Sequence, residues 1–368
     1  MKTSFLRHLS LTTALVLAAA SQSSFGQTTA TTDPVGFITL PIAGGGTVAS
    51  PKLTLVSPTV VQPISWQGAI TAVSTAGSGV NATTTITVSS TPTAPFTVGQ
   101  YQLNGPNGNF YAEIVTTSPN THVTGATGAI TSTPTTSSIV VSGNLTTPNL
   151  YVQVGDIVRI RKETTIADIF GANNSAGLNS TDDPSTADEI LLYNGADSVS
   201  YFYYVGDPSN PAGWYASASG SPAGNTPIGV NQGVVIKKKS AGNVSVTANG
   251  AVKTGDTLFP VRNGLNVLGT VSAKGFTLDQ SQLYTGNAAT GIKASDDPSV
   301  ADEVTIYSGS TQTNYFYYTG DVTNAAGWYS SANGAPSGSV TIAPGTSFVL
   351  KRKGGVAFNW SLPSPTSF

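Results

Sequence analysis

The sequence predicts an all-β protein, in which an N-terminal β-rich domain is followed by two duplicated antiparallel β units of the sandwich or small-barrel type. Three observations predict this fold class. Residues of high β propensity alternate with period two in short runs, turn residues separate these runs, and helical periodicity is absent downstream of residue 26. The chain also contains 40 glycines and 22 prolines, which disfavour helices. Short strands at regular spacing are typical of sandwiches and small barrels.

The first residues have the pattern of a secretory signal peptide. Lys2 and Arg7 precede an apolar stretch over residues 9–20, and small residues before Gln27 provide a cleavage site. We therefore expect residues 1–26 to be removed and the mature protein to be secreted, to the cell surface, the extracellular space or the periplasm. No later segment is apolar over the roughly 20 residues that a spanning helix needs, so we expect no transmembrane segment in the mature chain.

Composition excludes several classes of function. Only 9% of the residues are charged and the net charge is −2, so nucleic acid is not expected as a partner. The chain has no cysteine, which excludes a thiol nucleophile. His8 leaves with the signal peptide, and His122 lies in a Thr/Gly-rich stretch that is expected to be an exposed loop. A histidine-rich metal site is excluded as well. We expect no catalytic residue and no enzymatic activity.

Residues 33–155 are expected to form the N-terminal domain, which is nearly uncharged and rich in Thr, Ser and Gly. Between residues 34 and 155 the only charged side chains are Lys52 and Glu113. Apolar and polar residues alternate around Ile86 and Ile139, which is the period-two pattern of half-buried strands.

An internal repeat organises the second half of the chain. Residues 182–239 align without a gap with residues 296–353, at an offset of 114 (296 minus 182). We place the two β repeat units at residues 156–250 and 251–368. In the first unit, apolar and aromatic runs between Gly, Pro and Asn clusters predict an antiparallel meander of four strands, at residues 189–194, 199–205, 213–217 and 234–238.

Several short motifs together resemble a known group of proteins. They are the segment Asp33-Pro34-Val35-Gly36-Phe37, the DDPS-x-ADE segments, the Tyr-Phe-Tyr-Tyr runs, Gly-Trp-Tyr, and the Val-x-Lys-Lys/Arg-Lys endings. In these the chain resembles an uncharacterised family of secreted proteins that occurs as paralogous sets in Verrucomicrobia and their relatives. The resemblance covers most of the mature chain. It implies export and a β-rich build, and it carries over no catalytic residue.

Acidic residues form the densest charge cluster in each repeat. Asp-rich turns can supply the six to eight oxygens that calcium takes, so a calcium site in each repeat is one hypothesis. The Asp-x-Asp-x-Asp-Gly pattern is absent, however, and an Asp-Asp-Pro-Ser segment is also an ordinary turn in which Asp caps the backbone. We favour turn chemistry and expect no other cofactor. The candidate calcium ligands are Asp182, Asp183, Asp188, Glu189, Asp296, Asp297, Asp302 and Glu303.

Aromatic residues beside a glycine give a second candidate site in each repeat. Exposed rings stack on sugar faces, so carbohydrate binding by Trp214, Tyr215, Trp328 and Tyr329 is one hypothesis. Strand alternation sends neighbouring rings to opposite faces, so at least one face must be core. We favour a packing role for Trp214 and Trp328, because large aromatic side chains dominate core energetics.

Each repeat ends in three consecutive cations, at residues 237–239 and 351–353. A strand that carries several cations is most often the edge of a sheet, charged to prevent pairing with another edge. The alternative is contact of these cations with the acidic start of another unit or another protomer. We favour the edge-strand interpretation.

The leading functional hypothesis is a structural or adhesive protein of the cell surface or extracellular matrix. Duplicated β units with low charge suit association more than turnover, and the expected partners are other copies of the chain or a surface polysaccharide. The alternative is a carbohydrate-binding protein. A glycoside hydrolase, which needs two carboxylates, is a remote alternative because the acids here lie in turns of a duplicated unit.

Overall fold

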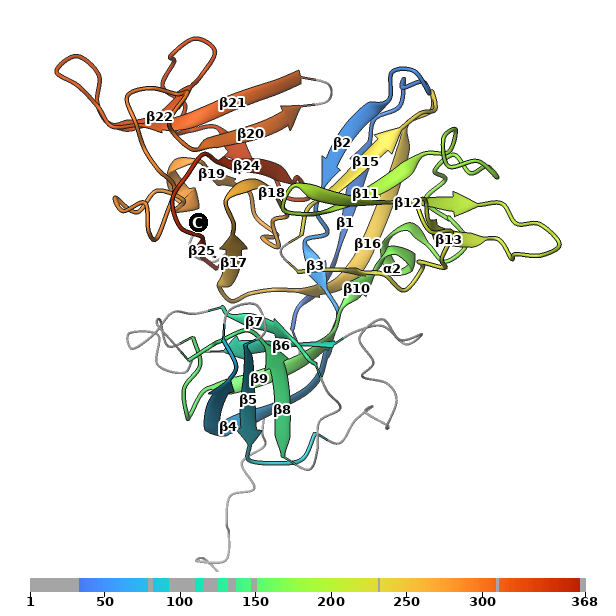
Figure 1. Ribbon diagram of the computed structural model, residues 1–368, viewed down its shortest axis with the longest axis horizontal. Coiled ribbons are helices and arrows are strands. Elements are labelled where there is room, and N and C mark those ends of the chain that lie inside the picture. Colours follow the sequence, from blue (N-terminus) through green and yellow to red (C-terminus); the bar gives the residue numbers. More distant parts are fainter. Residues whose placement is uncertain are drawn as a thin grey trace, which may run out of the picture. The chain divides into compact units, whose positions relative to one another are not determined.

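The computed structural model describes residues 33–78, 82–92, 110–115, 125–131, 137–146, 151–230, 232–308 and 311–364. The expected signal peptide and His122 lie outside these ranges. Strands make up nearly all of the regular structure and all sheets are antiparallel, which confirms the all-β prediction (Figure 1). Strands lie around Ile86 and Ile139, as the alternation predicts. The first and fourth strands of the predicted meander match their predicted ranges, and the second and third lie within two residues of theirs.

One short α-helix interrupts the strands of the described chain, α2 (Ile166–Phe170). Thr165 caps it, because its side chain accepts a hydrogen bond from the backbone N–H of Asp168, whose carboxylate accepts one from the backbone N–H of Thr165. This capping box satisfies two of the N–H groups that every helix start leaves unpaired. The helix buries Ile166, Ile169 and Phe170.

The first repeat is a two-layered sandwich. One layer is a five-stranded sheet with the order β13 (Gly213–Ala216), β12 (Asp197–Tyr204), β11 (Glu189–Asn194), β15 (Val234–Lys238), β2 (Lys52–Val56). The other is a sheet with the order β1 (Val35–Ile42), β16 (Val244–Val252), β3 (Val60–Val61). A short pair, β10 (Thr164–Thr165) with β14 (Pro227–Ile228), closes one side. Inward side chains from both layers form one apolar core.

The second repeat has the same plan. Its five-stranded sheet has the order β22 (Gly327–Ser330), β21 (Thr311–Tyr318), β20 (Glu303–Ser308), β24 (Phe348–Arg352), β18 (Gly264–Leu268). The facing pair is β17 (Thr257–Val261) with β25 (Phe358–Leu362), and the short pair is β19 (Phe276–Thr277) with β23 (Thr341–Ile342). A 3-10 turn, η2 (Asp279–Ser281), follows β19. Phe259, Phe348 and Trp360 are in contact at the centre of its core.

A third sheet lies between β3 and β10 in the chain. Its order is β7 (Thr127–Ala129), β6 (Phe110–Val115), β9 (Ile157–Lys162), β4 (Ile64–Ala76), β5 (Thr83–Val88), β8 (Ser138–Ser142). The sheet curls back on itself, because Ile130 beside β7 forms a bridge with Val141 of β8. The long strand β4 makes this possible, since its first half pairs with β9 and its second half with β5. The enclosed side chains form a separate apolar core.

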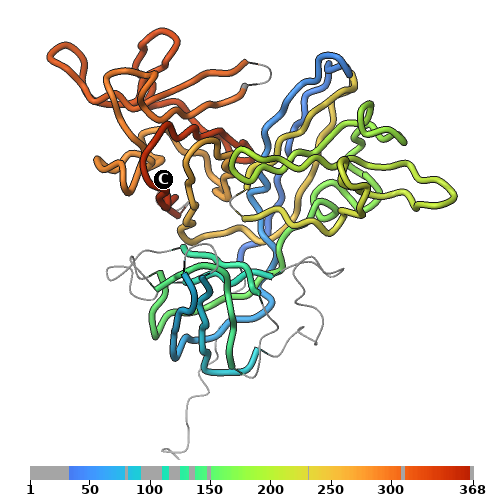
Figure 2. Tube along the Cα trace, in the orientation of Figure 1, coloured from blue at the N-terminus to red at the C-terminus, as the bar shows by residue number. Residues whose placement is uncertain are grey.

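The strand pairing divides the chain differently from the predicted domains 33–155, 156–250 and 251–368. Residues 35–61 belong to the first repeat, since β1 pairs with β16 and β2 with β15, whereas β9 belongs to the third sheet. Figure 2 shows this N-terminal segment running beside the chain that carries β15 and β16. In the second repeat, residues 269–275 connect β18 to β19; in the first, residues 57–163 connect β2 to β10. The third sheet is therefore an insertion into the first repeat.

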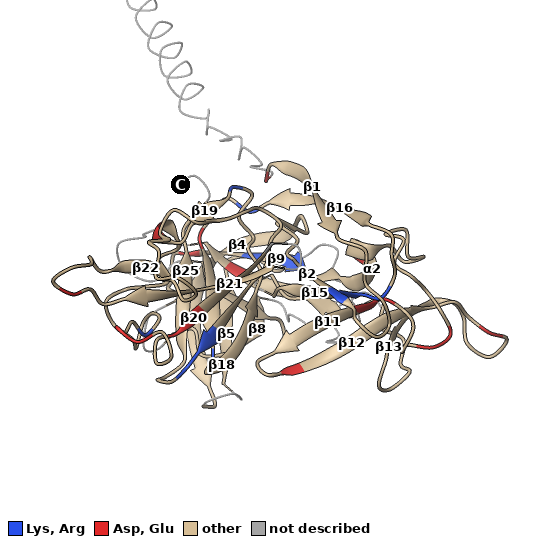
Figure 3. Ribbon diagram, turned by 90° about the horizontal axis from the view of Figure 1, so that it is seen from above, with Lys and Arg blue, Asp and Glu red and all other residues tan. Residues whose placement is uncertain are grey.

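A buried ion network fastens the inserted sheet to the repeats. Glu113 of β6 accepts a hydrogen bond from Arg161 of β9 at 2.8 Å and pairs with Lys253, which follows β16, at 2.6 Å. Arg161 also pairs with Asp33, which precedes β1, at 2.6 Å. The side chains of all four residues are at most 9% exposed. Charged residues are otherwise sparse along the described strands, as Figure 3 shows.

Candidate ligand-binding cleft between the repeats

Trp214 and Trp328 lie in the cores of their repeats. Each is 3% exposed, and the indole N–H of Trp214 donates a hydrogen bond to the carbonyl oxygen of Gly171 at 2.8 Å. Each indole also meets the edge of an inward tyrosine ring, Tyr203 or Tyr317. Both tryptophans therefore lie where the favoured packing role places them. Their indole faces are not open to a sugar.

The outward aromatic residues of each repeat hold a loop in place. Tyr204 donates a hydrogen bond from its hydroxyl to the carboxylate of Asp207 at 2.5 Å, and Tyr215 donates one to the carbonyl oxygen of Pro211 at 3.0 Å. The second repeat contains the same arrangement at Tyr318 and Tyr329. These bonds explain why the Tyr-Phe-Tyr-Tyr, Gly-Asp and Gly-Trp-Tyr motifs occur together.

The eight acids proposed as calcium ligands differ in burial and in the contacts that they make. Asp183 and Asp297 accept hydrogen bonds from backbone N–H groups of their own turns, as turn chemistry predicts. Asp182 and Asp296 are exposed. Asp188 and Asp302 are fully buried. Within the described ranges no group of three or more acidic or histidine residues is placed to hold a metal ion.

The basic ends pair with these acids inside their own repeat. Asp188 pairs with Lys238 at 2.7 Å, and the matching Asp302 pairs with Arg352 at 3.0 Å. The edge-strand interpretation is wrong: β15 lies between β11 and β2, and β24 lies between β20 and β18. The alternation of these strands turns the middle cation inward, where the buried aspartate neutralises it.

The last acid of each cluster, Glu189 or Glu303, lies on the outward face of its sheet. Glu189 pairs with both Lys237 and Lys239, at 3.2 and 2.8 Å, whereas Glu303 pairs with Lys353 at 3.2 Å. Lys351 is the counterpart of Lys237. No ion pair joins it to a residue of the described chain, although it is the cross-strand neighbour of Glu303.

The two five-stranded sheets meet about a local two-fold axis. Val56 forms a bridge with Thr346, and Leu268 forms one with Gln232. Thr346 is the counterpart of Gln232 at the offset of 114, and the strand registers make Leu268 the counterpart of Val56. The two bridges are therefore the same contact made twice, as in an isologous dimer. Outward apolar side chains of the two sheets pack together at this interface. They come from Leu55, Leu191, Tyr193 and Val235 of the first repeat and Leu265, Val267, Tyr307 and Val349 of the second.

Small residues permit the close approach at this axis. A Cβ atom on Gly233 would lie 2.7 Å from the hydroxyl oxygen of Ser347, and one on Gly269 would lie 2.6 Å from that of Ser57. Ser347 is the counterpart of Gly233, and Gly269 is the counterpart of Ser57. A serine of one repeat therefore faces a glycine of the other at both places.

A cavity of about 240 Å³ opens where the two outward faces diverge. Tyr193 and its counterpart Tyr307 both line it, and both rings are partly exposed. Tyr307 donates a hydrogen bond from its hydroxyl to the amide oxygen of Gln312 at 3.4 Å. The lining is apolar on the first repeat and carries Glu303, Thr305, Gln312 and Lys351 on the second.

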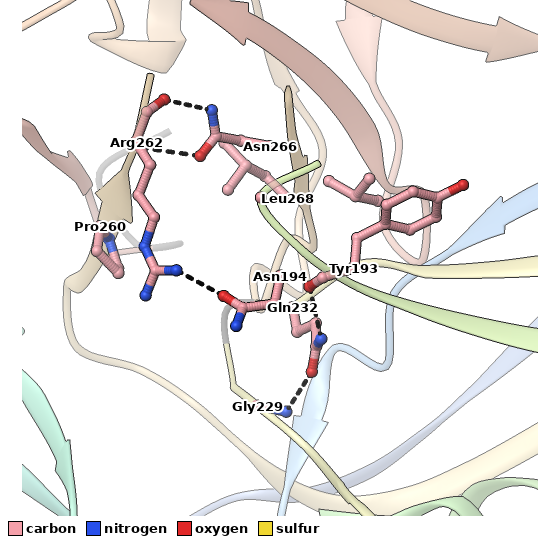
Figure 4. Close-up of a pocket in the computed structure, with 10 residues that line it drawn as sticks. Tyr193, Asn194, Gly229, Gln232, Pro260, Arg262, Asn266 and Leu268 are labelled. Atoms are coloured by element: carbon pink, nitrogen blue, oxygen red, sulfur yellow. Dashed lines mark hydrogen bonds between the residues drawn. The ribbon is translucent and has the colours of Figure 1, made fainter. Parts of the chain in front are cut away.

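A second cavity, of about 210 Å³, adjoins the first and shares Tyr193 and Val267 with it. Arg262, from the turn after β17, donates a hydrogen bond across this cavity to the amide oxygen of Asn194 at 2.5 Å (Figure 4). Gln232 donates one to the carbonyl oxygen of Tyr193, whose ring points away from Arg262. We call the two adjoining cavities the inter-repeat cleft.

The site residues predicted from the sequence do not include the cleft residues Tyr193, Tyr307, Asn194 and Arg262. A usable signal was present for the tyrosines, which occupy the same repeat position and alternate with Ile190 and Leu192, or with Val304 and Ile306, in each strand. Arg262 has no such signal, because its place beside Asn194 depends on how the repeats dock.

The chain matches no known protein family, no curated protein and no solved structure. No helix in the described part of the chain is long and apolar enough to cross a membrane.

Proposed function

We propose that this chain is a secreted, non-enzymatic adhesive protein of the cell surface or extracellular matrix, and that it binds polysaccharide in the inter-repeat cleft. The observation that carries the proposal is the lining of the cleft. Two partly exposed tyrosines lie beside amide side chains of Asn194, Gln232 and Gln312. Sugar rings present C–H faces that pack on aromatic rings, and hydroxyls that bond to amides, so a tyrosine with its apolar ring and polar tip suits them.

The same lining supports a role without catalysis. Glycoside hydrolysis uses a pair of carboxylates. Among the described residues, Glu303 is the one carboxylate that lines the two cavities, and it is paired with Lys353. This arrangement supports binding without turnover.

Assembly of copies into a layer is a second role, which strand β1 favours. β1 lies at the edge of its sheet, and Val35 and Phe37 are 82% and 73% exposed on its outward face. β1 carries no charged side chain, so the edges of two copies meet without like-charge repulsion. Sedimentation of the mature protein over a range of concentrations tests this role, and Phe37→Lys is expected to keep it monomeric.

Electrophoresis through gels that contain a polysaccharide tests the binding role. We expect the mature protein to be retarded by at least one member of a panel of plant, algal and bacterial polysaccharides. Tyr193→Leu and Tyr307→Leu keep an apolar side chain against the interface but remove the ring, so each should reduce the retardation. Tyr318→Phe, on the same sheet face but outside the cleft, is the matched control. Equal retardation of all three variants and the parent would contradict the proposal.

A further inference from the structure

We infer that the inter-repeat cleft takes an acidic polysaccharide, whose carboxylates are bound by Arg262 and Lys351. The inference deepens the proposed function and rests on it. The ligand class is a chain of uronic acids. Such a chain combines ring faces and hydroxyls with one carboxylate on each acidic sugar.

Arg262 is the first cation of the site. It is exposed at the cavity of about 210 Å³, which none of the described carboxylates lines. One guanidinium N–H of Arg262 donates to the amide oxygen of Asn194, and no acid of the described chain pairs with this arginine. A guanidinium carries five N–H donors in a planar fork that matches a carboxylate. The remaining donors are therefore available to a bound anion.

Lys351 is the second cation. It lines the neighbouring cavity and is exposed. Its cross-strand neighbour Glu303 is bonded to Lys353, so one carboxylate faces two ammonium groups and one positive charge remains. The first repeat offers a comparison, because there Lys237 does reach Glu189, at 3.2 Å. Of the matched lysines Lys237 and Lys351, Lys351 is the one that lines the cleft. It has no carboxylate partner among the described residues.

The two cations stand out against the rest of the chain. The protein carries a net charge of −2 and 9% charged residues, yet the cleft has Arg262 and Lys351 against one paired acid. A cleft lined by one sign of charge concentrates ligands of the opposite sign. Because Tyr193 and Val267 line both cavities, an extended chain that spans the cleft meets Arg262 in one cavity and Lys351 in the other.

Binding of polygalacturonate, compared with neutral dextran, tests the inference on the full mature chain. We expect polygalacturonate to bind, dextran to bind far more weakly, and the affinity for polygalacturonate to fall as salt rises. Arg262→Gln and Lys351→Gln should each lower the affinity for polygalacturonate by about ten-fold, because each variant loses one hydrogen bond to a charged group. Lys237→Gln, which removes the same charge at the equivalent position outside the cleft, is the control and should leave the affinity unchanged.

The outcomes separate this inference from the proposed function. If dextran binds as well as polygalacturonate and the Arg262 and Lys351 variants match the parent, the ligand is neutral and the inference is overturned while the proposed function stands. If Lys237→Gln weakens binding as much as Lys351→Gln, the attraction is general and the inference fails. If neither polygalacturonate nor dextran binds, the inference fails; the proposed function fails as well if no polysaccharide of the panel retards the protein.

Discussion

Replacing Glu113 with glutamine removes the charge at the centre of the buried ion network but keeps the shape of the side chain. Burial alone would raise the pKa of Glu113, but Lys253 and Arg161 outweigh it and lower this pKa from 4.5 to about 2. A gap of about 2.5 pKa units corresponds to about 3 kcal/mol of folding free energy, at 1.36 kcal/mol per unit. We expect Glu113→Gln to lower the free energy of unfolding at pH 7 by about that amount.

The pH dependence of this effect has a definite sign. A carboxylate whose pKa is lowered on folding stabilises the folded state fully above its unfolded pKa, and this stabilisation is lost as pH falls through the folded pKa. The difference between parent and variant should therefore be constant above pH 5 and shrink between about pH 4.5 and 2. Denaturant titrations followed by tryptophan fluorescence at pH 7, 5 and 3 measure it. A difference that stays the same at pH 3 as at pH 7, or that is below 1 kcal/mol throughout, would refute the electrostatic argument.

Three further outcomes are expected. Asp302→Asn leaves Arg352 buried without a carboxylate, so the free energy of unfolding should drop by about 3 kcal/mol in denaturant titrations; a drop under 1 kcal/mol would show that the buried pair is dispensable. The hydroxyls of Tyr204 and Tyr318 are bonded to aspartates, which raises the pKa of each to about 12, and burial raises the pKa of Tyr111 as well. A spectrophotometric titration should therefore show a late-ionising group of tyrosines, and Asp207→Asn should remove one tyrosine from that group by returning the pKa of Tyr204 toward 10. Trp214 and Trp328 are buried, and acrylamide should quench their fluorescence poorly; strong quenching would argue against their placement.

The parts of the fold that depend on local sequence were predictable. The strand β11 matches its predicted range, because Ile190 and Leu192 alternate with outward residues and Gly195 ends the run. The pairing of β1 with β16 was not predictable, because about 200 residues separate these strands and nothing in either sequence names its partner. For the same reason the inserted sheet looked like a separate N-terminal domain.

The short helix α2 and the basic strand ends show how local signals can be missed or misjudged. Thr165 and Asp168 form the Thr-x-x-Asp pattern of a capping box, but five helical residues are too few to show a helical period. The cations of residues 351–353 suggested an edge, yet Arg352 is buried because Asp302 lies opposite it. Charge along a strand predicts exposure only where no buried counter-charge is available.

The candidate cleft was the least predictable feature. Both tyrosines were detectable as a repeated pair, but their surroundings arise from the docking of two sheets. Arg262 shows this most clearly, since it comes from a turn of the second repeat and meets Asn194 of the first. The sequence of either repeat alone does not predict that contact.

The alternation of serine and glycine across the local axis has a consequence for the history of the duplication. In a dimer of two identical repeats, each of these contacts would have placed serine against serine or glycine against glycine. Here Ser347 occupies the space that Gly233 leaves, and Ser57 the space that Gly269 leaves. The contact surface of each repeat is thus complementary to that of the other repeat, and it is not complementary to itself. Either repeat docked against a copy of itself would place two serines at one of these two contacts, where a serine now faces a glycine.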